Sequence, residues 1–227
     1  MTTAAARPSP VWVSLEGPEA VGKTRLARHL ARLLAPRCRL LDEVTDATGR
    51  QVPALVLAAL AGGGDPFLRN GFPRTETVAL MGLVVRQQEV VDQIPVPPAV
   101  VVEDRGIDSV AIYQAAIMLG PDADDEQTWA LAQQLLATVT QWRTRPDLTV
   151  LLVDDLDICA ARWAQREGSP LTSEQRHLVA RATRLYRRQA ETESSRYRVV
   201  DRAGLTEPAL ISCVESLIEA AESDRRN

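Results

Sequence analysis

Short apolar runs alternate along this chain with longer stretches in which apolar residues recur every three to four positions. The first pattern predicts buried strands, and the second predicts helices with one apolar face. The predicted strands are Val11–Leu15, Cys38–Val44, Ala99–Glu103, Thr149–Val153 and Tyr197–Val200. The predicted helices include Val52–Leu60, Thr75–Ile94, Ile107–Leu119, Asp125–Arg143, Leu156–Arg166, Ser173–Glu191 and Glu207–Ser223. This alternation is typical of an α/β fold with a parallel sheet.

The 227 residues contain no internal repeat and no linker long enough to divide the chain. We therefore expect one domain over residues 11–227, preceded by a flexible tail over residues 1–10. A glycine–proline segment follows the helix predicted at Leu156–Arg166. We expect a lid near residues 162–172, with Glu167–Thr172 as its mobile loop.

The first predicted strand runs directly into Gly17-Pro18-Glu19-Ala20-Val21-Gly22-Lys23-Thr24, which fits the pattern G-x-x-x-x-G-K-[ST]. A helical pattern with a leucine-rich face follows it. Strand, glycine loop and helix together surround a polyphosphate with backbone N–H groups and the positive end of a helix dipole. Lys23 is expected to reach the β- and γ-phosphates of ATP, and the Thr24 hydroxyl to ligate Mg²⁺. The predicted ATP-binding residues are Gly17, Glu19, Ala20, Val21, Gly22, Lys23, Thr24 and Arg25.

Composition supports this interpretation. Of 26 basic residues, Lys23 is the only lysine, and an ammonium group is not equivalent to a guanidinium at such a site. The net charge of −4 argues against a general nucleic-acid binder. No apolar run approaches the roughly 18 residues needed to cross a bilayer. Three isolated cysteines, Cys38, Cys159 and Cys213, indicate reduced thiols and a cytoplasmic location.

A second group of polar residues follows the third predicted strand. Ligands gather at the carboxyl ends of parallel strands, so Asp104 and Arg105 should face the glycine loop. A carboxylate there can hold Mg²⁺, and an arginine can form a bidentate contact with a second phosphate. Arg105, Ser109 and Tyr113 are spaced by four residues, so they share one helix face. The alternative is a structural ion pair at a strand end, with the helix facing the core.

Arg162 and Arg166 are also four residues apart, on the helix before the predicted lid loop. Two such arginines can neutralise the charge that spreads over a transferring phosphoryl group. The alternative is a solvated arginine face, because the chain carries many arginines.

The order and spacing of these motifs resembles the thymidylate kinases, over roughly Val11 to Glu215. The resemblance implies a five-stranded P-loop kinase fold with helices on both faces of the sheet. It also implies transfer of the γ-phosphoryl group of ATP to a nucleoside monophosphate, with Mg²⁺. By this resemblance Glu19 lies near the acceptor sugar, Arg105 binds the acceptor phosphate, and Arg86 points toward the base. Tyr113 would pack on the sugar beside Gln114, with Ser109 in the same slot, and Arg162 and Arg166 would be lid arginines.

The chain departs from the family pattern where a base would be recognised. Gly82 stands where the family has a stacking phenylalanine, and Val110 where it tends to have a polar base contact. Gly106 replaces an aromatic residue or histidine, and Asp42-Glu43-Val44 replaces Arg-Glu-Pro. Loss of base–aromatic stacking costs roughly 1–3 kcal/mol. We therefore expect dTMP to be a mediocre substrate, and a nucleotide with a larger or different base to react better.

Two other functions fit the same residues. One is a kinase of an unphosphorylated nucleoside or secondary metabolite, with Glu103 or Asp104 as the base. The other is a nucleotide-binding regulatory protein, although a slot built from Arg105, Ser109 and Tyr113 argues against it. For the leading hypothesis the expected partner is a small-molecule acceptor, with no nucleic acid and no membrane, in a homodimer.

Overall fold

Five parallel strands form one sheet in the computed structural model, which describes residues 9–46, 52–60 and 65–225. The strand order is β2-β3-β1-β4-β5. The strands are β1 (Val11–Glu16), β2 (Cys38–Leu41), β3 (Val100–Asp104), β4 (Leu148–Val153) and β5 (Tyr197–Asp201). The parallel sheet predicted from the apolar runs is therefore confirmed. Most of the tail predicted at residues 1–10 lies outside the described residues.

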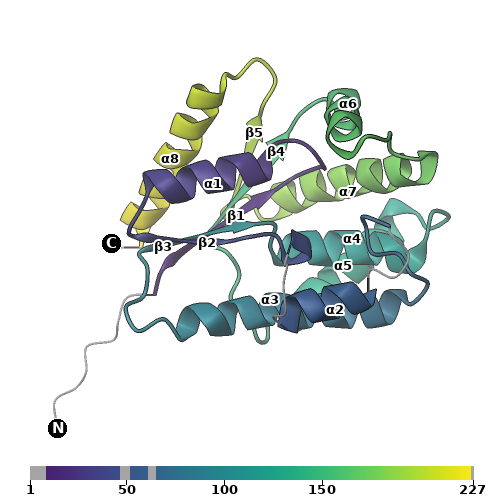
Figure 1. The fold of residues 1–227 in the computed structure, drawn as a ribbon, viewed down its shortest axis with the longest axis horizontal. Helices are drawn as coiled ribbons and strands as arrows, with labels where there is room; N and C mark the ends of the chain where they lie inside the picture. The colour runs from purple at the N-terminus through teal and green to yellow at the C-terminus, as the bar shows by residue number, and fades with distance from the viewer. Residues whose placement is uncertain (1–8, 47–51, 61–64, 226–227) are drawn as a thin grey trace, which may run out of the picture.

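Helices cover both faces of the sheet (Figure 1). Helices α1 (Lys23–Leu33) and α8 (Glu207–Asp224) pack on one face, where they share an apolar core with β1, β3 and β4. The opposite face and its flanks carry α2 (Val52–Leu60), α3 (Pro73–Asp92), α4 (Ile107–Leu119), α5 (Asp125–Val139), α6 (Leu156–Glu167) and α7 (Ser173–Thr192). No helix in the described part of the chain combines the length and apolar composition that a membrane crossing requires.

The largest differences from the predicted element boundaries are at the ends of β2 and α5. Strand β2 ends at Leu41 rather than Val44, because its pairing with β3 stops there, and a 3-10 turn follows at Val44–Asp46. Helix α5 ends at Val139 rather than Arg143. The chain turns back there, so that the fully buried Arg143 can pair with Glu103 of β3 and donate to the backbone oxygen of Val84 (2.9 Å).

Side chains alternate between the two faces of the sheet along β3, and this alternation decides which face Glu103 and Asp104 point to. Val100 and Val102 point into the core shared with α1 and α8. The period of two residues therefore directs Asp104 toward the α1 side and Glu103 toward the opposite face. Strands β1 and β3 pair in register up to Leu15 and Asp104, so the loop after β1 and the loop after β3 leave the sheet side by side.

Candidate active site

The glycine loop after β1 leads into the first turn of α1. Gly22 caps this helix in the left-handed conformation (φ 107°), and a Cβ there would lie 2.6 Å from Arg202 Nη1. Gly17 also has a positive φ of 137°, and a Cβ there would overlap the carbonyl oxygen of Leu152. Both positions therefore require glycine. The loop holds its backbone close to β4 and opens the N-terminus of α1 for an anion.

Lys23 is the first residue of α1, and its side chain folds back under the loop. Its Nζ donates to the carbonyl oxygens of Gly17 (3.1 Å) and Pro18 (2.7 Å), and only 4% of the residue is exposed. Burial lowers the pKa of Lys23, and the nearby Arg105 lowers it further. A buried ammonium group beside open helix N–H groups is a preorganised site for phosphate oxygens.

Two cavities flank the loop, and they meet at Glu19 and Glu43, which line both of them. The first, which we call the donor cavity, has a volume of about 650 Å³. Besides the two glutamates it is lined by Ala20, Gly22, Lys23, Thr24, Arg25, Arg28, Arg32, Arg162, Arg166 and Glu167. Most of these side chains are basic, so this cavity suits a polyphosphate.

The second cavity, which we call the acceptor cavity, has a volume of about 80 Å³ and mostly apolar walls. Its polar end combines Arg105, Ser109, Tyr113 and Gln114, four residues predicted to bind the acceptor. Ser109 and Tyr113 share one face of α4, whereas Arg105 precedes that helix with a positive φ of 62° and reaches the same cavity from the loop after β3. The Oε1 of Gln114 accepts a hydrogen bond from the Thr77 hydroxyl (3.0 Å).

Arg105 lines the acceptor cavity and pairs with both glutamates that the two cavities share. Its Nη2 pairs with Glu19 Oε1 (2.5 Å), its Nη1 donates to Ser109 Oγ (3.2 Å), and its Nε lies 3.0 Å from Glu43 Oε1. The guanidinium also stacks 5.3 Å above the Tyr113 ring centre. Arg105 has a positive φ of 62°, a strained conformation for a residue with a side chain, and such strain concentrates at functional sites.

The charged groups around Arg105 shift one another's pKa values. Burial would raise the pKa of Glu19, but Arg105 and Lys23 lower it below its ordinary value. Burial raises the pKa of Glu43 to about 7, although Arg105 opposes the shift. Glu19 is therefore the firmly ionised partner of Arg105, and Glu43 the weaker one.

Several buried polar atoms at this junction have no hydrogen-bond partner within the described part of the chain. They are both carboxylate oxygens of Asp104, the Nε of Arg105 and the hydroxyl of Tyr113. Leaving such groups unpaired costs about 1–3 kcal/mol each, so a folded protein rarely keeps them without a ligand or water. Arg105 and Tyr113 line the acceptor cavity, and Asp104 is close enough to Lys23 and Glu43 to raise the pKa of both, so these atoms mark a site for a polar ligand.

A divalent cation fits the residues at this junction. Asp104 is 1% exposed, and its carboxylate has no hydrogen-bond partner among the described residues. Its negative charge raises the pKa of Lys23. Thr24, the residue after Lys23, lines the donor cavity. Mg²⁺ typically uses one or two protein ligands and completes its shell with water and substrate phosphates. Among the described residues no group of three or more histidine, cysteine or acidic side chains forms a metal cluster. The donor set therefore suits a cation that arrives with a nucleotide.

Comparison with known proteins agrees with this geometry. A family model described as thymidylate kinase matches residues 15–209. The chain belongs to the thymidylate kinase family. It is a phosphotransferase, an ATP-dependent kinase of nucleoside monophosphates. A search of curated proteins finds no match.

Two solved structures have the same fold. The thymidylate kinase of Candida albicans superposes with a TM-score of 0.67 at 18% identity, covering 96% of this chain and 94% of that one. The enzyme of Ehrlichia chaffeensis gives a TM-score of 0.57 at 18% identity, with 92% of this chain and 99% of that chain covered. These likenesses support the predicted five-stranded P-loop kinase fold.

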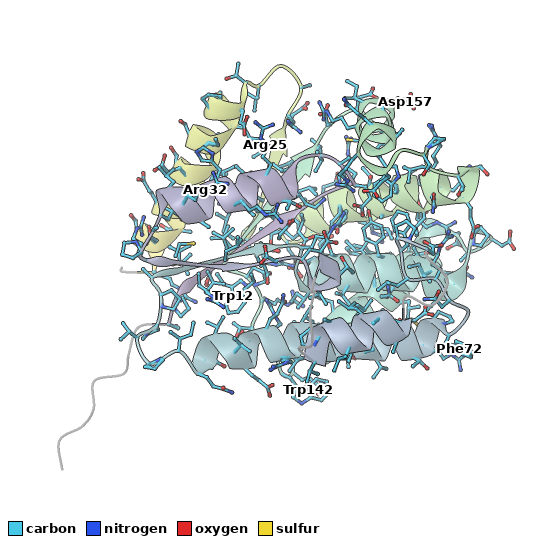
Figure 2. All side chains as sticks on the ribbon, in the orientation of Figure 1. Trp12, Arg25, Arg32, Phe72, Trp142 and Asp157 are labelled. Atoms are coloured by element: carbon cyan, nitrogen blue, oxygen red, sulfur yellow. The ribbon has the colours of Figure 1, made fainter. Side chains whose placement is uncertain are left out.

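Arg162 and Arg166 line the donor cavity of this kinase from α6, and their function as lid arginines stays a prediction. Arg162 Nη1 pairs with Asp154 (2.6 Å), and Arg166 Nε with Glu167 (2.7 Å), so both are held by carboxylates. Arg25, labelled on α1 in Figure 2, also lines this cavity. Its guanidinium pairs with Glu207 (2.5 Å). Val21 is fully buried, and its carbonyl oxygen accepts from Arg202.

The structure does not bring Arg86 to the acceptor cavity. Arg86 and Gly82 lie on an exposed face of α3, and a Cβ at Gly82 would meet nothing within 4 Å. The residues of α3 that line the cavity are Leu80 and Val84. The helical periodicity places these two on the buried face, whereas family spacing pointed to the neighbouring face.

Three functional residues were missed by sequence reasoning. Phe67 supplies an aromatic wall of the acceptor cavity, and its ring stacks on Tyr113 at 6.0 Å. Glu43 closes the junction between the cavities. Glu16, which is fully buried, lies beneath Arg105 and accepts hydrogen bonds from Ser14, Gly106, Ser109 and Tyr186. The available sequence signal for Glu16 was its position as an acidic residue directly before the glycine loop.

Proposed function

We propose that ATP binds in the donor cavity and that a nucleoside monophosphate binds in the acceptor cavity, with its phosphate on Arg105. The carrying observation is a set of buried atoms without a hydrogen-bond partner in the described part of the chain: the carboxylate oxygens of Asp104, the hydroxyl of Tyr113, and the Nε of Arg105, which forms only an ion pair with Glu43. A phosphate there would accept from Nε and from the Tyr113 hydroxyl. It would also lie between the basic donor cavity and the apolar pocket that suits a base.

The transfer needs no general base, because an acceptor phosphate is already ionised near pH 7. One of its oxygens attacks the γ-phosphorus of ATP, the new P–O bond forms, and the bond to the β,γ-bridging oxygen breaks as ADP leaves. The protein positions the two phosphates and stabilises the developing charge. Lys23 would serve the β- and γ-phosphate oxygens, and Arg162 and Arg166 would neutralise charge from the lid.

Thr24 and Asp104 would hold Mg²⁺, which neutralises phosphate charge when bound. The role of Glu19 follows from its pairing with Arg105 at 2.5 Å. A firmly ionised carboxylate there fixes the direction of the guanidinium and keeps it charged. Glu19 is therefore a positioning residue for Arg105, close to the acceptor sugar.

The walls of the acceptor cavity suggest how a base would be accommodated. Phe67, Leu80 and Val84 provide apolar surface, and Val110 offers no hydrogen bond. Gln114 is a polar side chain of the cavity wall that could form a hydrogen bond with a base edge. Poor use of dTMP stays a prediction, and it now depends on Val110 and on the size of the cavity rather than on the exposed Gly82.

A kinase acting on a hydroxyl group remains the second candidate. Glu43 favours it, because burial raises its pKa to about 7, which suits a base at the junction of the cavities. Of the two bases suggested by the sequence, Glu103 and Asp104, Glu103 does not fit this role, because it is fully buried and paired with Arg143.

The test is a coupled ADP-release screen of the full chain with ATP and Mg²⁺ across nucleoside monophosphates and the matching nucleosides. A broad panel is appropriate because broad substrate specificity is described for the Candida albicans relative. Turnover of monophosphates alone supports the proposal. Turnover of nucleosides alone supports the hydroxyl kinase, and ATP binding without acceptor-dependent ADP release supports a regulatory role. A homodimer and a cytoplasmic location stay predictions.

A further inference from the structure

Tyr186 takes part in a hydrogen-bond network beneath Arg105 that the proposed transfer does not use. The centre of this network is Glu16, the last residue of β1, whose side chain is fully buried. Its Oε1 accepts from the backbone N–H of Gly106 (2.8 Å), and its Oε2 accepts from the hydroxyls of Ser109 (2.5 Å) and Tyr186 (3.0 Å). Tyr186 lies on α7 and is also fully buried, so neither Glu16 nor Tyr186 can touch an acceptor directly.

Ser109 joins this network to Arg105. Its Oγ accepts a hydrogen bond from Arg105 Nη1 (3.2 Å). The same oxygen lies 2.5 Å from Glu16 Oε2 and 2.5 Å from the Tyr186 hydroxyl. A serine side chain can choose among three staggered rotamers, and these two buried partners hold it in the one that faces the guanidinium.

Arg105 depends on Ser109 for its orientation. Its Nη2 is hydrogen-bonded to Glu19, whereas its Nε has no hydrogen-bond acceptor in the described part of the chain. A planar guanidinium held at one nitrogen can still rotate about that contact, so the bond from Nη1 to Ser109 supplies the second fixed point. The Tyr186 ring adds support, because its edge packs against Tyr113 (centroids 6.3 Å apart, planes at 64°), on whose ring Arg105 stacks.

We propose that Tyr186 is a positioning residue for Arg105, which acts through Glu16 and Ser109 to hold the guanidinium in the orientation that receives an acceptor phosphate. This inference rests on the proposed function, in which Arg105 binds that phosphate. Helix α7 packs on α4, which carries Ser109, so Tyr186 reaches this place from 77 positions further along the chain. The acceptor site is therefore completed by a helix that does not itself line the acceptor cavity.

The network tolerates either charge state of its centre. Burial and the negative charge of Asp108 raise the pKa of Glu16, while the hydrogen bond from Ser109 opposes the rise. An ionised Glu16 accepts from both hydroxyls, and a protonated Glu16 would donate to one of them instead. Both forms keep the oxygens of Ser109 and Tyr186 in contact with the carboxyl group, so the role of Tyr186 does not depend on the charge of Glu16.

The alternative is a purely structural tyrosine, because Tyr186 also belongs to the apolar cluster that contains Tyr113 and Trp163. Loss of its hydroxyl would then loosen the wall of the acceptor cavity and weaken every ligand of that cavity alike. A positioning role instead affects ligands that carry a phosphate, because Arg105 serves the phosphate.

The first test removes only the hydroxyl, in Tyr186→Phe. The matched control is Tyr197→Phe, which makes the same change at a buried tyrosine of β5 that lines neither cavity. Calorimetric titrations use dTMP and thymidine as probes, which differ only in the phosphate. We expect Tyr186→Phe to bind dTMP about fivefold more weakly, as for the loss of one neutral hydrogen bond, and thymidine within about 1.5-fold of the wild type. Tyr197→Phe should match the wild type for both. Equal weakening of dTMP and thymidine, or unchanged dTMP affinity, overturns the proposal.

The second test follows the route through Ser109. In Ser109→Ala the linking hydroxyl is already absent, so adding Tyr186→Phe should change dTMP affinity by less than about 1.5-fold, because residues of one network are not additive. A further loss of about fivefold would mean that Tyr186 acts independently of Ser109, and it overturns the proposed route.

The third test needs no nucleotide. Nuclear magnetic resonance of protein with isotope-labelled arginine measures how fast the guanidinium protons of Arg105 exchange with water, and Arg105→Lys assigns their signals. We expect exchange at least about threefold faster in Tyr186→Phe than in the wild type and in Tyr197→Phe. Equal exchange in all three proteins overturns the proposal even if dTMP binds none of them. The ADP-release screen judges the proposed function separately, because it measures turnover by the wild type alone.

Discussion

Gly106, which immediately follows Arg105, offers a sharp test of the packing beneath the active site. Its φ of −120° is accessible to any residue, so backbone strain does not require a glycine here. A Cβ would instead lie 2.7 Å from Glu103 Cδ and 2.8 Å from Ser14 Oγ. Glu103 cannot retreat easily, because its side chain is fully buried and paired with the equally buried Arg143.

The cost of Gly106→Ala follows from these contacts. Overpacking a close-fitting core costs about 1–3 kcal/mol, and a displaced Glu103 would also weaken its buried ion pair, whose loss costs about 3–5 kcal/mol. We expect a loss of about 3 kcal/mol, which lowers the melting temperature by roughly 6–12 °C for a domain of this size. The matched control is Gly82→Ala, because a Cβ at that exposed helical position meets nothing within 4 Å. It should raise stability by about 0.4–1 kcal/mol.

Calorimetric melting of both variants, in the absence of nucleotide, measures these effects. Adding Glu103→Asp to Gly106→Ala should restore part of the lost stability, because the shorter side chain withdraws its carboxylate from the new methyl group. If Gly106→Ala melts within about 2 °C of the wild type, a shift of less than 1 kcal/mol, the reasoning about Glu103 is wrong.

Three further outcomes follow from the site. Lys23→Ala should reduce turnover by about 10²–10³ with the fold intact, and near-normal turnover would contradict its role at the phosphates. Arg166→Ala should lower kcat more than it raises KM for ATP, and equal effects would make it a ground-state contact. Burial raises the pKa of Glu43 from 4.5 to about 7, so its contribution to stability is full below pH 4.5 and is lost as the pH rises through 7. The free energy of unfolding should therefore fall between pH 5 and pH 8 by up to about 3 kcal/mol more in the wild type than in Glu43→Gln, as urea titrations can measure, and parallel profiles would refute this.

The strands and the glycine loop could be predicted because they depend on local patterns. Apolar runs such as Val11–Leu15 must be buried, and the spacing of Gly17, Gly22 and Lys23 allows few other conformations. Strand β2 was predicted too long, because Val44 is apolar like Leu40 and Leu41 but packs with α2 and α3 instead of pairing with β3. The pairing of β2 with β3, and not the sequence of β2 itself, decides where β2 ends.

The unpredicted parts of the site depend on contacts between distant residues. Glu43 and Phe67 reach the junction and the acceptor cavity from loops whose direction no local pattern fixes. The pairing of Glu103 with Arg143 joins residues 40 positions apart, and it explains why Gly106 departs from the family pattern. The structure places Arg86 on an exposed face of α3, away from the acceptor cavity, for the opposite reason. Spacing along a helix was taken from a family pattern, whereas the apolar positions of α3 decide which face is buried.

The central claim is that Arg105 holds the acceptor phosphate, and Arg105→Lys tests it most directly. Lysine keeps a positive charge between Glu19 and Glu43 but lacks the Nε donor and the planar fork. With the best monophosphate from the ADP-release screen, we predict an acceptor KM about 10–100-fold higher and a KM for ATP within about twofold of the wild type, since a hydrogen bond to a charged group is worth about 1.5–3 kcal/mol. An unchanged acceptor KM would contradict the account.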